Sequence, residues 1–191
     1  MSIKGTSGDD NLVGTSGNDA FDLTQGGNDT AQGLAGNDSF SFGATFTAAD
    51  AVDGGDGADV LKLAGDYSAG VTFGAATLIN VETVSLADGF SYKLTTNDAT
   101  VATGQSMTVD GSALTGANTL TFDGSAETDG TLAVHGGLGN DSFTSSTLHS
   151  PRPASPAPWN STATTPPASP SARPRSAASA TWRWTRAIPT S

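Results

Sequence analysis

A nine-residue pattern rich in glycine and aspartate recurs through the first sixty residues, and it limits the fold more than any other feature of the chain. The copies start at Gly5, Gly14, Thr24, Gly33, Gly54 and Gly136. The last two copies read GGDGADVLK and GGLGNDSFT, with glycine at positions one, two and four and aspartate at position six. So short a period is typical of solenoid proteins, in which neighbouring repeats stack because one repeat cannot bury its apolar face alone.

The sixth position of every copy is an aspartate, and glycine dominates the first and fourth positions. Calcium prefers about six to eight hard oxygen ligands, so carboxylates and backbone carbonyls must converge on one point. Glycine permits the positive φ angles that turn carbonyl groups inward. The spacing therefore predicts calcium-binding turns. The predicted metal-site residues are Gly5, Gly8, Asp10, Gly14, Gly17, Asp19, Gly27, Asp29, Gly33, Gly36, Asp38, Gly54, Gly57, Asp59 and Asp141.

Position eight carries an apolar side chain in every copy. These side chains are Leu12, Phe21, Ala31, Phe40, Leu61 and Phe143. One inward-pointing residue per copy predicts a short strand over positions seven to nine, and two copies would form one coil of a parallel β-roll. The core of such coils is thin and their carboxylates repel one another. We therefore predict that residues 1–62 are disordered without calcium and fold when it binds.

The copies resemble the nonapeptide GGxGxDxUx of the RTX, or haemolysin-type, calcium-binding repeat proteins. The resemblance implies an all-β fold, a right-handed parallel β-roll or β-solenoid, with Ca²⁺ between equivalent turns of successive coils. The sixth-position aspartates then pair every second repeat. The expected pairs are Asp10 with Asp29, Asp19 with Asp38, and Asp38 with Asp59, the last across a degenerate half-coil at 42–53 that contains Asp50 and Asp53. We expect two or three ions in this block, and weak or no binding at Asp141.

The rest of the chain divides into three segments. Residues 63–135 alternate Val-, Leu- and Thr-rich runs with glycine turns, and they look like a β-solenoid spacer. Candidate strands lie at 60–63, 71–73, 81–86, 91–94, 107–109, 119–122 and 131–134. Residues 136–144 are an isolated repeat. Residues 145–191 lack Gly, Asp and Glu and are rich in Pro, Ala and Ser, which predicts a disordered tail; the abrupt change in composition is also what a frameshift in a GC-rich gene would produce.

Composition excludes several classes of protein. Before Thr144, 19 acidic residues stand against three lysines, a net charge of −16, so the chain lacks the basic surface that binds nucleic acid. There is no cysteine for a disulfide or a thiolate metal site. No apolar run reaches the ~18 residues of a membrane span, and residues 1–12 lack an apolar signal core. We expect no N-terminal export signal and no membrane span.

These observations favour a non-enzymatic calcium-binding module of a secreted, extracellular bacterial protein, with metal as a structural cofactor. The family is associated with type I secretion. Two alternatives remain open: a fragment of a secreted protease or lipase whose catalytic domain is absent, and a segment of an adhesin or surface layer with cell-surface or matrix contacts. The motifs HExxH, GxSxG and GxxxxGK[ST] do not occur, and neither glutamate lies where an EF-hand loop would need it.

Overall fold

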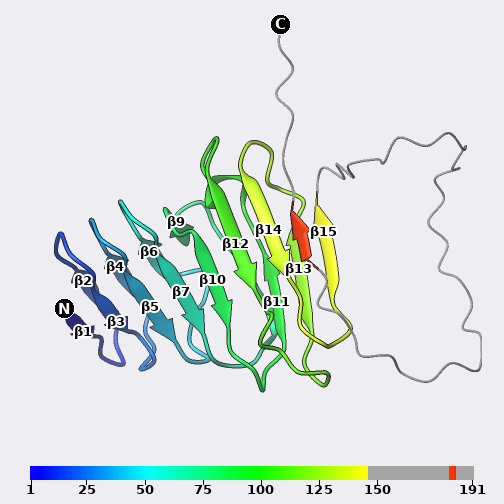
Figure 1. Cartoon of the computed structure of the whole chain (residues 1–191). Coiled ribbons are helices and arrows are strands. Elements are labelled where there is room, and N and C mark those ends of the chain that lie inside the picture. Colours follow the sequence, from blue (N-terminus) through cyan, green and yellow to red (C-terminus); the bar gives the residue numbers. More distant parts are fainter. Residues whose placement is uncertain (146–180, 184–191) are drawn as a thin grey trace, which may run out of the picture.

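The computed structural model describes residues 1–145 and 181–183, and these residues form a stack of β-coils (Figure 1). The first block contains β1 (Ser2–Lys4), β2 (Asn11–Val13), β3 (Ala20–Asp22), β4 (Thr30–Gln32), β5 (Ser39–Phe42), β6 (Ala51–Asp53) and β7 (Val60–Leu63). The later strands are β8 (Tyr67–Thr72), β9 (Leu78–Ile79), β10 (Thr83–Leu86), β11 (Tyr92–Thr95), β12 (Ser106–Asp110), β13 (Leu120–Gly124), β14 (Thr131–His135), β15 (Ser142–Ser145) and β16 (Thr181–Arg183). A single 3₁₀ turn, η1 (Asp98–Thr100), accompanies the strands in this part of the chain.

Three sheets form the walls of the stack. One sheet runs its whole length in the order β1-β3-β5-β7-β10-β12-β14-β16. The opposite wall begins as β2-β4-β6-β9, and a third sheet, β15-β13-β11-β8, is added in the second half. Every pair is parallel except β14–β16. The predicted all-β parallel solenoid is confirmed.

The coils lengthen along the stack, and this changes their cross-section. The step between paired residues of the long sheet is 18 residues from Ser2 to Ala20, then 19, 21 and 23, and it is 25 from Thr83 to Thr108 and from Ser106 to Thr131. Eighteen residues match two nonapeptides. The longer coils add the third sheet, which starts at β8, and the coil of β8, β9 and β10 has a strand in each of the three sheets. The roll of nonapeptides therefore continues directly into a solenoid of longer coils through the long sheet.

The core is a file of apolar side chains at position eight of the repeats, continued by the later strands. Phe21, Phe40 and Leu61 occupy equivalent places in β3, β5 and β7, and each is at most 1% exposed. The rings of Phe21 and Phe40 stack with centroids 4.7 Å apart. Aromatic stacking of this kind adds to the free energy gained by burial. Parallel in-register pairing thus brings identical repeat positions into one continuous core.

The strands agree well with those expected from the sequence. All seven candidate strands of residues 60–134 have a counterpart, whereas the two-residue β9 has none among the predictions. Most of the tail predicted to be disordered, 145–191, lies outside the described residues. The structure differs from that prediction at Ser145, which ends β15, and at β16, the red arrow in Figure 1, which pairs with the edge of β14. Thr and Trp favour strands, and an unpaired sheet edge accepts a further strand.

Leu34 offers a test of the turn geometry. Its φ is 78°, in the left-handed region, and its side chain is largely exposed. In the copy that starts at Gly54, the equivalent residue is Gly55, with φ 91°. Because the left-handed region costs a non-glycine residue about 1–2 kcal/mol, Leu34→Gly should raise the free energy of unfolding of the calcium-loaded protein by about 0.5–1 kcal/mol in denaturant titration. Ala35→Gly, at a residue without positive φ, should lower it; equal effects of the two changes would contradict this account.

Candidate calcium-binding site

The structure arranges the acidic residues of the first block in two columns. The odd column consists of Asp19, Asp38 and Asp59, which directly precede β3, β5 and β7. The even column consists of Asp10, Asp29 and Asp50, which directly precede β2, β4 and β6. Each column follows one edge of the roll because successive coils are stacked in register. The aspartates within one column therefore lie one above another.

One oxygen of each later aspartate is fixed by the coil before it. In the odd column, the amide of Asp19 donates to Oδ1 of Asp38 at 2.7 Å, and the amide of Asp38 donates to Oδ1 of Asp59 at 2.7 Å. In the even column, Asp29 Oδ1 accepts from the amide of Asp10 at 3.0 Å, and Asp50 Oδ1 accepts from the amide of Asp29 at 2.8 Å. These bonds orient each carboxylate between two turns.

The other oxygen is buried without a partner in three of these residues. Asp29, Asp38 and Asp59 are each at most 1% exposed, and within the described residues their Oδ2 atoms accept no hydrogen bond. A buried carboxylate oxygen without a partner is costly, unless a cation or donor meets it. Asp19 differs: its Oδ2 accepts from the Thr15 amide at 2.6 Å, and its Oδ1 lies 2.6 Å from the ammonium of Met1.

Backbone carbonyl oxygens lie close to the Oδ2 atoms of the odd column. A Cβ atom built on Gly33 would lie under 3.0 Å from both Asp38 Oδ2 and the Gly54 carbonyl oxygen. On Gly14 it would lie 2.7 Å from Asp19 Oδ2 and 2.7 Å from the Gly33 carbonyl oxygen. A carboxylate of one turn and a carbonyl of the next coil thus converge beside the first-position glycine. Such a set of hard oxygens fits calcium.

The fourth-position glycines serve a different purpose. Gly27, Gly36 and Gly57 have φ of 117°, 109° and 148°, and a Cβ on each would clash with the backbone of the preceding turn. Gly8 and Gly17 begin their columns, and a Cβ on either would meet no backbone within 4 Å. The absence of a side chain at Gly27, Gly36 and Gly57 therefore lets successive turns stack at close range. Among the first-position glycines, Gly5 is less constrained than Gly14 and Gly33, since a Cβ on Gly5 would lie 3.1 Å from Asp10 Oδ2.

Burial and like charge shift the titration of the stacked aspartates. The pKa of Asp29 is raised above its usual value of 3.8, chiefly by burial and further by the charges of Asp50 and Asp10. The pKa of Asp59 is raised in the same way, chiefly by burial and then by Glu82. By contrast, hydrogen bonds from Thr24 and Gln25 lower the pKa of Asp22 to about 2. Ionised Asp29 and Asp59 are therefore disfavoured by the metal-free coil.

Asp141 lies apart from both columns. Its Oδ1 accepts from the amide of Leu120 at 2.8 Å, and its Oδ2 lies beside Gly136, as in the earlier repeats. The residue at its register position in the preceding coil is Leu120 rather than an acid. The geometry of a single turn is reproduced there, but the carboxylate stacks on no second carboxylate.

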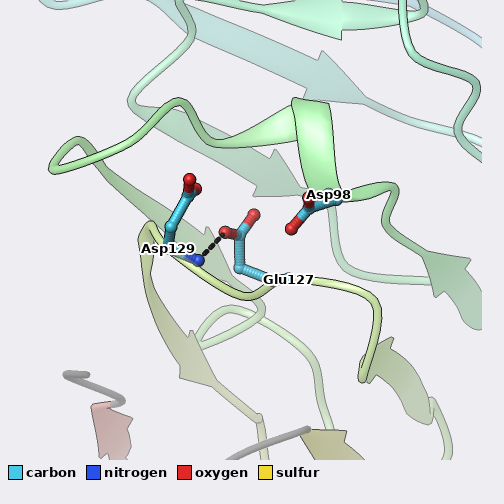
Figure 2. Close-up of side chains that lie close together, drawn as sticks. All are labelled: Asp98, Glu127 and Asp129. Atoms are coloured by element: carbon cyan, nitrogen blue, oxygen red, sulfur yellow. Dashed lines mark hydrogen bonds between the residues drawn. The ribbon is translucent and has the colours of Figure 1, made fainter. Parts of the chain in front are cut away.

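A separate acidic group lies among the longer coils, at a place that the sequence analysis did not single out. Asp98, Glu127 and Asp129 bring one carboxylate oxygen each within 4.8 Å of one another (Figure 2). The backbone amides of Asp129 and Gly130 donate to Glu127 Oε1 at 3.1 and 2.7 Å. Asp98 is exposed, Asp129 is half-buried, and the two are separated by 31 positions in the sequence. No local spacing pattern could have revealed this group, because coil stacking alone brings it together.

Comparison with known families agrees with the geometry of the first block. The model of the RTX calcium-binding nonapeptide repeat (4 copies) matches residues 4–26, 23–41 and 47–64. Residues 4–64 are thus similar to RTX calcium-binding repeats, and we call them the RTX block. The match at 47–64 contains Asp50, whose turn departs from the nonapeptide pattern, and the matched ranges do not include 136–144. No curated protein and no solved structure showed a significant match to the chain.

The RTX block is thus one part of a longer solenoid. The matched residues end at 64, close to the last residue of β7, whereas the long sheet continues through β10, β12 and β14. Within the part of the chain that is described, the structure contains no apolar helix long enough to traverse a lipid bilayer.

The glycines of the RTX block provide a matched pair of variants. Gly33→Ala would place a methyl group where Asp38 Oδ2 and the Gly54 carbonyl converge. We expect it to lower the bound-calcium count by at least one and to cost about 1–3 kcal/mol of unfolding free energy in calcium. Gly17→Ala, where a Cβ meets nothing within 4 Å, should leave the count unchanged and cost less than about 0.5 kcal/mol. Equal calcium counts in the two variants would refute this role of Gly33.

Asp29→Asn should change stability in opposite directions with and without metal. In chelator, with sucrose added to favour the compact state, the variant should be more stable by about 1–3 kcal/mol because it removes a buried charge without a partner. In saturating calcium it should be less stable than the unsubstituted protein, because it weakens a metal site. Denaturant titrations in the two buffers measure both differences.

Asp22→Asn is the control for this sign change. Its carboxylate is satisfied by hydrogen bonds from Thr24 and Gln25, and its side chain is 42% exposed. A folded-state pKa lowered to about 2 stabilises the protein above the usual aspartate pKa, and the contribution is lost as the pH falls toward 2. At neutral pH the variant should therefore be destabilised in both buffers. If Asp29→Asn also destabilises the protein in both buffers, the buried Asp29 carboxylate does not destabilise the metal-free state, and this explanation is wrong.

Proposed function

We propose that the RTX block binds calcium ions between successive coils and that these ions are structural cofactors of the solenoid. The observation that carries the proposal is the set of buried Oδ2 atoms of Asp29, Asp38 and Asp59 without hydrogen-bond partners in the described part of the chain. In the odd column, the carbonyl oxygens of Gly54 and Asn80 lie beside the Oδ2 atoms of Asp38 and Asp59, next to Gly33 and Gly54. Bound calcium would supply the positive charge that these oxygens lack.

The chain's own residues would perform three tasks in such sites. The amides of Asp10, Asp19, Asp29 and Asp38 orient the carboxylate of the following coil through hydrogen bonds. The first-position glycines leave room for the converging oxygens, and the fourth-position glycines allow the turns to stack closely. The position-eight side chains exclude water from the space between the walls. Among the residues predicted from the sequence as ligands, we assign no such task to Asp141, or to Gly8 and Gly17, where a Cβ would meet no backbone of a neighbouring turn. Asp50 joins the even column although it was not among the predicted ligands.

Metal binding of this kind is coupled to folding. Without calcium, stacked acids of one charge are buried beside one another, and the pKa values of Asp29 and Asp59 are raised for that reason. Ligand binding to the folded state alone stabilises that state. Repeat modules of extracellular proteins commonly bind calcium at about 10⁻⁴–10⁻³ M, weaker than cytosolic concentrations can fill. We therefore propose that this chain is part of a secreted bacterial protein that folds once outside the cell.

Circular dichroism of the full chain tests this coupling. The strand signal should be weak in excess chelator and strong in millimolar calcium, and re-chelation should reverse the change. A strand signal of the same size in both buffers would contradict folding on calcium.

The number of ions tests the sites themselves. Calorimetric titration should show saturable binding that the double variant Asp19→Ala/Asp38→Ala reduces, because both residues belong to the odd column. The matched control is Asp110→Ala/Asp123→Ala, which changes two aspartates that cap local turns by accepting from the amides of Ser112 and Ser125. The control should keep the stoichiometry of the unsubstituted protein. Identical stoichiometry in all three proteins would rule out the odd column as a metal site.

A further inference from the structure

The odd column continues by one residue beyond the RTX repeats. The next strand of the long sheet after β7 is β10, and Val60 of β7 pairs with Thr83 of β10. Glu82 therefore occupies the register position that follows Asp59 in the column. The amide of Asp59 donates to Oε2 of Glu82 at 2.7 Å, which repeats the bond that each earlier aspartate makes with the next acid.

The backbone carbonyl that lies beside the aspartate in the repeat turns also has an equivalent at this turn. A Cβ built on Gly54 would lie close to both Asp59 Oδ2 and the carbonyl oxygen of Asn80, under 3.0 Å from each. In the previous turn the same places are taken by Asp38 Oδ2 and the Gly54 carbonyl, beside Gly33. Asn80 reaches this position with φ 50°, in the left-handed region that asparagine tolerates better than most residues. Its side-chain amide is held by Asp53 Oδ1 at 2.8 Å.

Asp59 supplies an independent indication that a ligand belongs in this place. Its side chain is fully buried, and among the described residues its Oδ2 atom has no hydrogen-bond partner. The free oxygen and the Asn80 carbonyl oxygen both lie beside the Cα of Gly54, where a Cβ would contact each of them. Two oxygen atoms that carry negative charge are thus brought together with no counter-charge between them.

The turn that carries Glu82 is shorter than the repeat turns. Six residues, 54–59, separate β6 from β7, whereas three residues, 80–82, separate β9 from β10. The missing length leaves a polar cleft of about 470 Å³ beside the turn. Its lining includes Asp53, Asp56, Asn80, Glu82 and Gln105.

We propose that Asp59, Glu82 and the Asn80 carbonyl form a further site for a hard divalent cation, which closes the odd column with a residue outside the repeat pattern. The family match ends at residue 64, so neither Asn80 nor Glu82 belongs to the matched repeats. Three protein groups do not complete the six to eight oxygens that calcium takes, and the cleft admits water for the remaining positions. The proposal rests on the calcium binding proposed above and adds one ion to the odd column.

This site would exchange its ion faster than the enclosed sites, because two of its three groups, Asn80 and Glu82, line the cleft. It also lies where the roll of nonapeptides meets the longer coils, since β9 and β10 are the strands on either side of the turn 80–82. An ion there would stabilise the contact between the RTX block and the following coils.

The test compares calcium stoichiometry in three full-length proteins by calorimetric titration and equilibrium dialysis. The Glu82→Gln variant keeps an acceptor for the Asp59 amide but removes the charge, so it should bind one ion fewer than the unsubstituted protein. The control is Asp66→Asn, at an exposed carboxylate that accepts a hydrogen bond from the amide of Ser68. The control should bind the full number. Unchanged stoichiometry in Glu82→Gln, with calcium bound normally by the other two proteins, would overturn the proposal.

A failure of the broader calcium proposal is distinguishable, because the unsubstituted protein would then bind no calcium. If Glu82→Gln does not fold, a crystal of the unsubstituted chain grown with terbium decides the question by anomalous scattering. A peak between Asp59 and Glu82 is expected. Peaks between Asp19 and Asp38 or between Asp38 and Asp59, without one at Glu82, would refute the further site.

Discussion

Buried carboxylates that face one another govern this solenoid. Each aspartate after the first in its column has one oxygen held by an amide of the neighbouring coil. In Asp29, Asp38 and Asp59 the other oxygen has no hydrogen-bond donor within the described residues. The hydrogen bonds fix the geometry and do not neutralise the charge. A cation is the group that satisfies both the burial and the repulsion. The stability of the first block is for that reason inseparable from the metal that we assign to it.

Glycine makes this arrangement sterically feasible. At Gly33 and Gly54 a side chain would occupy the point where carboxylate and carbonyl oxygens converge. At Gly36 and Gly57 it would collide with the turn below. The turns therefore stack at a spacing that other residues would prevent, and the thin core of Phe21, Phe40 and Leu61 stays closed. Metal sites and core depend on the same close spacing.

The second half of the molecule achieves stability by a different route. Its coils are longer, up to 25 residues between paired strands, and they enclose a wider core with buried Tyr92, Leu94, Phe122 and Val134. Tyr67 and Tyr92 stack with ring centroids 5.8 Å apart, and the Tyr92 hydroxyl donates to the Ala87 carbonyl. Burial of these large apolar side chains stabilises the longer coils. The transition between the two regimes lies at β8–β10, beside Glu82.

The sequence alone determined the repeat unit, its strands at positions seven to nine, the apolar file and the aspartates that form the two columns. It could do so because a fixed period converts local spacing into stacking in register. Only the tertiary structure decided what lies at the irregular places. It put Glu82 above Asp59 across a step of 23 residues, brought Asp98 to Glu127 and Asp129, and left Asp141 stacked on Leu120. Coil length varies there, and which residues meet depends on how each longer loop is accommodated by the walls.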